Sequence, residues 1–158
     1  MSANIVELGE GVRDALNAHS FSQDFTAVFS FNPNISNMDA KTLQVIVTDA
    51  GGDIRLVSRQ QMQMLDTIDV IVLHRVDSGA TGIDEAKVKA AFLLMDELAE
   101  FLIRRVIAEY SPLGSIRRGR GDGEKQHYMK GDLQDRLFAA TLAISYATRV
   151  AISSEESS

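Results

Sequence analysis

The sequence contains no cysteine and no tryptophan, and its 16 basic residues are outnumbered by 22 acidic ones, which gives a net charge of −6. The absence of cysteine excludes disulfides, thiolate metal ligands and a cysteine nucleophile, and it is compatible with a reducing cytoplasm. The acidic balance argues against nucleic-acid binding by overall electrostatics. No apolar run approaches the roughly 20 residues of a membrane span, and the first residues show no signal-peptide pattern.

The remaining composition is that of an ordinary globular protein. The chain has 158 residues, of which 45% are hydrophobic and 24% are charged. This length is sufficient for one domain with a real core. We therefore expect a single α+β domain over residues 1–152, followed by a disordered tail at 153–158.

The stretch from Asp84 to Tyr110 has the strongest periodicity in the chain. Apolar residues recur there every three or four positions, as on one face of an α-helix, and no Gly or Pro interrupts them. Asp84 is a suitable N-cap, and Pro112 and Gly114 supply a stop. At 1.5 Å per residue this long central helix would measure about 40 Å. Further apolar side chains widen the apolar stripe of this helix beyond one face. The additional residues, which predict a subunit interface, are Leu94, Phe101, Ile103 and Ile107.

A second helix is predicted at the N-terminal end, over residues 3–19. Its apolar residues share one face, and Asn4 with Glu7 forms a plausible capping pair. Gly9 and Gly11 each cost about 1 kcal/mol relative to Ala inside a helix. They mark either the close approach of a neighbouring element or two tolerated glycines.

Alternating apolar and polar residues predict several strands. Residues 25–31 and 43–48 each alternate cleanly. Between 49 and 53 a turn signal follows, in which Gly51-Gly52 could supply the positive φ values of a tight hairpin. From Ile54 onward apolar residues reappear at even-numbered positions, and the register is held through Gln60 and Asp66. This pattern indicates either one long strand with a bulge near Asp66-Thr67 or two strands with a polar link.

The C-terminal part of the chain adds a short strand at 113–116 and a long one at 138–150, where small and bulky residues alternate. Strands joined by hairpins favour antiparallel pairing. The predicted fold class is therefore α+β, with a mixed, mostly antiparallel sheet packed by the long central helix and the N-terminal helix.

The sequence shows no constellation of catalytic, cofactor-binding or metal-binding residues. His19, His74 and His127 have no metal-ligand spacing, and His74 is expected to end the core face of a strand. No serine lies in a Gly-x-Ser-x-Gly turn. The glycines at 119, 121 and 123 lack the Gly-Lys-Ser or Gly-Lys-Thr ending of a phosphate loop. We therefore expect a protein that is not an enzyme and that uses no cofactor.

One basic concentration stands out in this acidic chain, in a Gly- and Arg-rich segment at 114–131 that is predicted to be a mobile loop. Most of its side chains are expected to be solvated. The alternative is an interaction segment that becomes ordered on an acidic surface or on a phosphate backbone. Its candidate residues are Arg117, Arg118, Arg120, Lys125 and Lys130.

The order of elements resembles that of the tail terminator, or tail completion, proteins of long-tailed bacteriophages, and of the related neck and head–tail joining proteins. The N-terminal helix, the paired strands near 43–47, the strand at 67–73, the helix at 84–110 and the closing strand at 138–146 carry the resemblance, which covers most of the chain. The family has no signature motif, so size and element order define the likeness.

The resemblance implies a structural virion protein that is assembled in the host cytoplasm. Such proteins form a ring, usually of six subunits, at the head-proximal end of the tail tube. The ring ends tube polymerisation and joins the tail to the head, so its implied partners are the tail tube protein and a head connector or neck protein. DNA passes through the lumen without specific binding, and no membrane is involved. The alternative function is a small nucleic-acid-binding module that uses the basic loop at 117–130, and a small enzyme ranks third.

Overall fold

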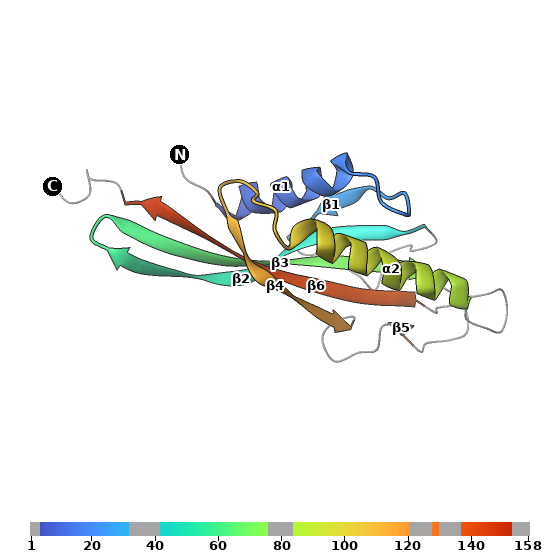
Figure 1. Ribbon diagram of the computed structural model, residues 1–158. Helices are drawn as coiled ribbons and strands as arrows, with labels where there is room; N and C mark the ends of the chain where they lie inside the picture. The colour runs from blue at the N-terminus through green and yellow to red at the C-terminus, as the bar shows by residue number, and fades with distance from the viewer. Residues whose placement is uncertain (1–3, 32–41, 76–83, 121–127, 130–136, 153–158) are drawn as a thin grey trace.

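Two helices lie over one face of a long, twisted sheet in the computed structural model of the chain (Figure 1). The structure describes residues 4–31, 42–75, 84–120, 128–129 and 137–152. The tail at 153–158 therefore lies outside the described residues. The α+β class predicted from the sequence is confirmed, and the details below differ from the prediction at three places.

The N-terminal helix α1 spans Ile5–Ala18, as predicted. The Asn4 side chain accepts a hydrogen bond from the Glu7 backbone N–H at 2.9 Å, which confirms the expected cap. The two glycines mark close approaches. A Cβ at Gly9 would collide with the ring of Phe29, and a Cβ at Gly11 would come within 2.5 Å of an Ile107 methyl group.

The second helix, α2, spans Glu85–Leu102. Asp84 caps it as predicted, with its carboxylate accepting from the N–H groups of Ala86 and Lys87. The predicted extension to Tyr110 is wrong: the helix has 18 residues, or about 27 Å, so it is not the long central helix that we expected.

The chain beyond α2 reaches the core by a turn instead of a helix. Ala108 and Glu109 have φ values of 50° and 67°, outside the helical range. The backbones of Ile107 and Tyr110 bond to each other in both directions, at 3.0 and 2.8 Å. This turn buries the side chains of both residues. Their spacing therefore imitates the helical period although their backbone is not helical.

The main sheet has the strand order β1-β2-β3-β6-β4, and the short β5 pairs with β6 beyond the end of β4. Only β1 and β2 are parallel, so the sheet is mixed and mostly antiparallel, as predicted. The strands are β1 (Ala27–Phe29), β2 (Gln44–Ser58), β3 (Gln61–Arg75), β4 (Ser111–Arg120), β5 (Tyr128–Met129) and β6 (Leu137–Ala151).

The core lies between the two helices and the sheet. Its members from the strands are every second residue of β2, β3 and β6, as period-2 alternation requires. The helices contribute one stripe each, including Leu8 and Val12 from α1 and Leu94 and Leu98 from α2. On the opposite face of the sheet a smaller buried cluster contains Ile46, Ile71, Leu73 and Ala139.

The hairpin between β2 and β3 turns at Arg59 and Gln60, whereas the sequence predicted the turn at Gly51-Gly52. Residues 54–58 thus belong to β2, and of the two alternatives for the segment 54–76 the structure has two strands. Gly51 and Gly52 instead form a bulge, where the pairing steps from Asp49–Ile68 to Gly52–Asp66. Gly51 has a φ of 98°, which suits glycine.

The predicted loop at 114–131 differs from the structure in its first part. Residues 114–120 belong to β4, which pairs with β6 on both sides of a bulge between Pro112 and Ile116. Tyr128 and Met129 form β5. The remainder of that segment lies outside the described residues.

Candidate functional site

The sheet extends past both helices as a three-stranded arm (Figure 1). We define the arm as residues 52–66 of the β2–β3 hairpin together with residues 147–151 of β6. All of residues 51–61 are exposed. The arm is thus the part of the described molecule that stands furthest from the core, and it is held there by backbone pairing within the sheet.

The bulge determines which side chains the arm presents on each face. Before the bulge, the odd-numbered residues of β2, such as Val47, face the helices. After the bulge, the even-numbered residues face the helices, because the bulge inserts one extra residue into β2. Ile54 and Leu56 therefore lie beside Met64 and Met62 on the helix-facing side. No helix covers them there, and they are 65% and 68% exposed.

The two outer edges of the arm have free backbone groups among the residues that the structure describes. On one side, β1 pairs with β2 only as far as Val47, so the outer edge of residues 52–58 has no strand partner. On the other side, β4 pairs with β6 only up to Ala147, which leaves residues 148–151 without one. An unpaired strand edge is a template for pairing with another chain.

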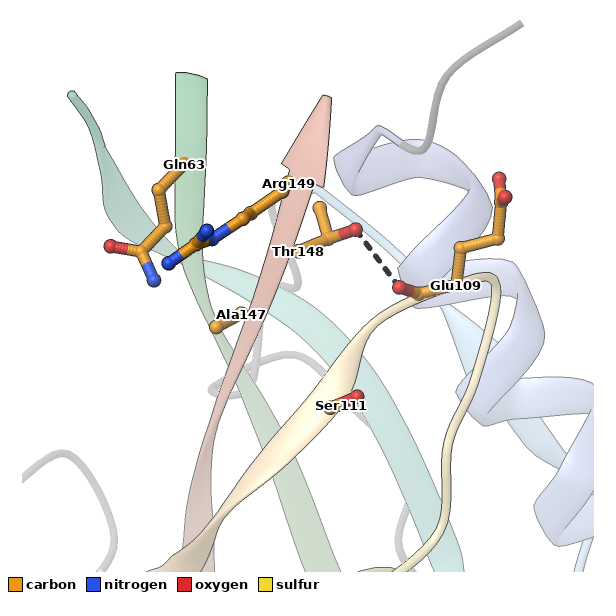
Figure 2. A pocket seen from close by; sticks show the side chains of 6 residues that line it. All are labelled: Gln63, Glu109, Ser111, Ala147, Thr148 and Arg149. Atoms are coloured by element: carbon orange, nitrogen blue, oxygen red, sulfur yellow. Dashed lines mark hydrogen bonds between the residues drawn. The ribbon is translucent and has the colours of Figure 1, made fainter. Parts of the chain in front are cut away.

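A hollow lies at the base of the arm, where β4 leaves the β6 edge (Figure 2). Its volume is about 420 Å³. The Thr148 hydroxyl donates to the Glu109 carbonyl at 2.9 Å and so fixes the turn that closes one end. The lining residues are Gln63, Glu109, Ser111, Ala147, Thr148 and Arg149.

The free edge of β4 differs from the edges of the arm because it is protected. Pro112 has no N–H to donate, and the bulge that follows it contains Gly114 with a φ of 85°. Arg117 and Arg118 add charge along the strand. Proline, bulges and charged residues are the usual devices that prevent edge-to-edge association. Residues 52–58 of β2 contain no proline, and their bulge lies near the turn, between Leu56 and Ser58. They do carry Asp53 and Arg55, so a strand that pairs with this edge has to complement these charges.

The basic residues predicted as an interaction segment do not form one surface. Successive residues of a strand point to opposite faces, so Arg117 and Arg118 lie on different sides of β4. The Arg118 guanidinium is 3.3 Å from the Asp96 carboxylate on α2. Arg120 ends β4, whereas Lys125 and Lys130 lie outside the described residues.

The residues predicted as a subunit interface lie mostly inside the chain. Leu94 is fully buried in the core and Ile107 is 7% exposed, so neither offers a surface to a second subunit. Phe101 is half-buried among His19, Phe21 and the Arg105 guanidinium, which lies 4.0 Å from its ring centroid. Ile103 is also half-buried.

Sequence reasoning missed the exposed apolar pair on the arm, Ile54 and Leu56. A signal for them was present, since the apolar positions change from odd to even numbers between Val47 and Ile54. That change marks where the strand is re-registered. It does not reveal that the helices end before the arm does.

The surroundings of the polar side chains buried near the core indicate a structural role for them. The Tyr110 hydroxyl donates to the Asp66 carboxylate at 2.5 Å, and burial, followed by this hydrogen bond, raises the tyrosine pKa. Burial alone raises the pKa of Tyr146, whose hydroxyl has no hydrogen-bond partner within the described part of the chain. His74 lies at the end of the core face, where burial and then Lys87 lower its pKa.

Two further searches of the described residues bear on function. No group of three or more His, Asp or Glu side chains among them is arranged to hold a metal ion. Neither described helix is both long enough and apolar enough to cross a membrane. No protein-family model matches the chain, and no curated protein matches it either. The geometry of the arm is therefore the strongest guide to function.

Proposed function

We propose that this chain is a structural subunit that assembles with copies of itself into a ring at the head-proximal end of a long-tailed bacteriophage tail tube. In this role it ends tube polymerisation and joins the tail to the head. The single observation that carries the self-association is the arm, with its exposed Ile54 and Leu56 and its open edges. The resemblance in element order supplies the place in the virion.

The arm supports assembly because its exposed features are unfavourable in an isolated subunit. Two large aliphatic side chains on one strand are about two thirds exposed to water, and burying the exposed part of each would contribute about 1–2 kcal/mol. The neighbouring backbone has free donors and acceptors along the same strand. An association that covers both features at once gains apolar burial together with backbone hydrogen bonds.

The alternative function, nucleic-acid binding through the segment 117–130, has less support. A phosphate-binding surface needs several cations on one face. Arg117 and Arg118 point to opposite sides, and Arg118 is paired with Asp96. The net charge of −6 also opposes a polyanion. A salt-dependent DNA titration with Arg117→Ala would reveal such binding, and the ring hypothesis expects no effect of this substitution on DNA affinity.

The first test of the ring is the molar mass in solution, measured by light scattering after size exclusion at low and moderate salt. We expect a hexamer or a monomer–hexamer mixture. Because the arm contacts are largely apolar, the oligomer should persist when salt is raised. A strict monomer at high protein concentration would contradict the proposal.

A variant separates assembly from folding. Ile54→Asp/Leu56→Asp replaces two side chains that are more than half exposed, so we expect the free energy of unfolding of the monomer to change by less than about 1 kcal/mol. The oligomer should be lost. Leu93→Asp is a matched control, because Leu93 is 61% exposed on α2, away from the arm, and it should leave the mass unchanged.

The place in the virion requires its own test. Purified protein is mixed with polymerising tail tube subunits from the same phage, and the tubes are viewed by electron microscopy. A ring capping one tube end, with shorter tubes at higher protein concentration, is the expected result. Tubes of unchanged length without a terminal ring would refute this role while leaving self-association intact.

A further inference from the structure

The arm has two open edges of different sequence, one on each side of the same three strands. The β2 edge exposes Ile54 and Leu56, whereas the β6 edge ends in the hollow beside Arg149. A contact between two different surfaces is head-to-tail, and such contacts close into rings when the rotation allows it. Each copy would then offer one edge to each of its two neighbours.

We propose that the β2 edge of one copy pairs with the β6 edge of the next copy, so that the arms form one continuous sheet around the ring. This inference rests on the proposed ring and names the surface that builds it. The occupant is a second copy of this chain, because the arm carries both halves of the junction. The two halves also complement each other in charge, as the following observations show.

The direction of the junction follows from the sheet. Both β2 and β6 are antiparallel to β3, so they run parallel to each other within one copy. A rotation about an axis that runs along the arm preserves strand direction. The β2 edge of the next copy therefore runs parallel to β6.

Charge selects the register of this pairing. Within one copy Leu56, Met62 and Val150 lie at the same level. If the next copy kept that level, Arg55 would lie beside Arg149, and like charges side by side are unfavourable. A stagger of two residues places Asp53 of the next copy beside Arg149 instead. Within the described residues neither Asp53 nor Arg149 has an ion-pair partner.

The same two-residue stagger also brings compatible residues together on the helix-facing side of the arm and beside Thr148. Ile54 of the next copy would lie beside Val150 on the helix-facing side, since both strands alternate with the same period. Gly52 of the next copy would lie beside Thr148, whose hydroxyl is bound to the Glu109 carbonyl where the β4 pairing ends. A residue without a side chain fits there. Before Gly52 the β2 strand of the next copy has to leave the β6 edge, because β4 occupies that edge from Ala147 onward. A stagger between neighbouring strands is also what a closed sheet requires.

Engineered cysteines test the junction cleanly, because the chain has no cysteine of its own. Asp53→Cys and Arg149→Cys are made singly and together; both native side chains are exposed. Neighbouring strands lie about 4.7–4.9 Å apart, so two cysteines side by side across a strand pair come close to disulfide range. Lys89→Cys, on an exposed position of α2, is the control for random oxidation.

Under mild oxidation we expect an equimolar mixture of the two single variants to give a disulfide-linked heterodimer. Each single variant alone, and the control, should remain uncrosslinked at the same concentration. The double variant should give a ladder on a denaturing gel that stops at the number of subunits in the ring. Crosslinking of Asp53→Cys with itself would show a two-fold β2–β2 contact and would overturn the inference.

Charge reversal gives an independent readout. Asp53→Arg and Arg149→Asp should each weaken assembly by up to about five-fold, and the combined variant should recover most of the loss. If a ring is found by light scattering but neither crosslinks nor charge rescue occur, another surface builds it; the inference then fails while the proposed function stands. A monomer without crosslinks would overturn both.

Discussion

Two buried tyrosines allow the same substitution to be made in opposite circumstances. Tyr110 and Tyr146 are both fully buried. The Tyr110 hydroxyl donates to the Asp66 carboxylate at 2.5 Å, whereas the Tyr146 hydroxyl has no hydrogen-bond partner among the residues that the structure describes. Replacing either residue by Phe removes one oxygen and leaves the ring in place. We therefore expect Tyr110→Phe to lower the free energy of unfolding and Tyr146→Phe not to lower it.

The expected changes in the free energy of unfolding follow from the hydrogen bonds that each tyrosine hydroxyl makes. Tyr110→Phe removes a hydrogen bond to a charged group, which contributes about 1.5–3 kcal/mol, and we expect the lower end because Asp66 is half-buried and can be hydrated. Tyr146→Phe removes a hydroxyl that was buried without compensation, so the free energy of unfolding should be unchanged or higher by about 1 kcal/mol. For a chain of this size each kcal/mol shifts Tm by about 2–4 °C.

The assay is urea denaturation followed by circular dichroism, because the chain has no tryptophan to report by fluorescence. The slope of the free energy against urea should be the same for both variants, since neither changes the surface exposed on unfolding. An equal loss of stability in the two variants would refute the reasoning. So would a greater loss for Tyr146→Phe than for Tyr110→Phe.

Three further outcomes are expected. Burial raises the pKa of the Tyr146 hydroxyl in the folded state. The contribution of Tyr146 to stability is therefore complete below its unfolded-state pKa of about 10 and is lost as pH rises further. The alkaline loss of stability should be smaller in Tyr146→Phe. Burial, followed by Asp49, raises the pKa of Asp69, so stability falls as pH rises above about 3.9, and Asp69→Asn should be more stable than the wild type at pH 7 but equal to it at pH 3. Gly52→Ala would push a Cβ into the Leu65 carbonyl oxygen and should increase amide hydrogen exchange in the arm while exchange in the core of β3 stays slow.

The elements with an unbroken period could be predicted from the sequence. Helix α1, the N-terminal cap of α2 and the long alternation of β6 are all local patterns, and the structure confirms them. The mixed sheet followed from the same strands. In each case the pattern of buried residues and the backbone conformation agree over many consecutive positions.

The errors arose where one pattern has two structural causes. A change from odd to even apolar positions can mean a tight turn or a bulge, and the glycines at 51 and 52 suit both. Likewise Ile107 and Tyr110 keep a helical spacing although a turn places them in the core. Only tertiary pairing distinguishes these cases, and that information is not local to the segment.

The candidate site was the least predictable part. A high density of charge drew attention to residues 117–130, yet strand alternation separates Arg117 from Arg118 and α2 engages one of them. The exposed pair on the arm became visible only once the helices were seen to end before the sheet does. Exposure of an apolar residue depends on which elements cover it, and a single sequence does not state this.

The bulge at Gly51 and Gly52 also has a consequence for how this protein can change over evolutionary time. Since it sets the phase of the distal part of β2, inserting one residue between the bulge and the turn would invert both faces of that strand. Inserting two residues in each strand of the hairpin would preserve them. The projecting end can thus grow or shrink in paired steps while the packing under the helices stays the same, so related chains should differ in reach by even numbers of residues.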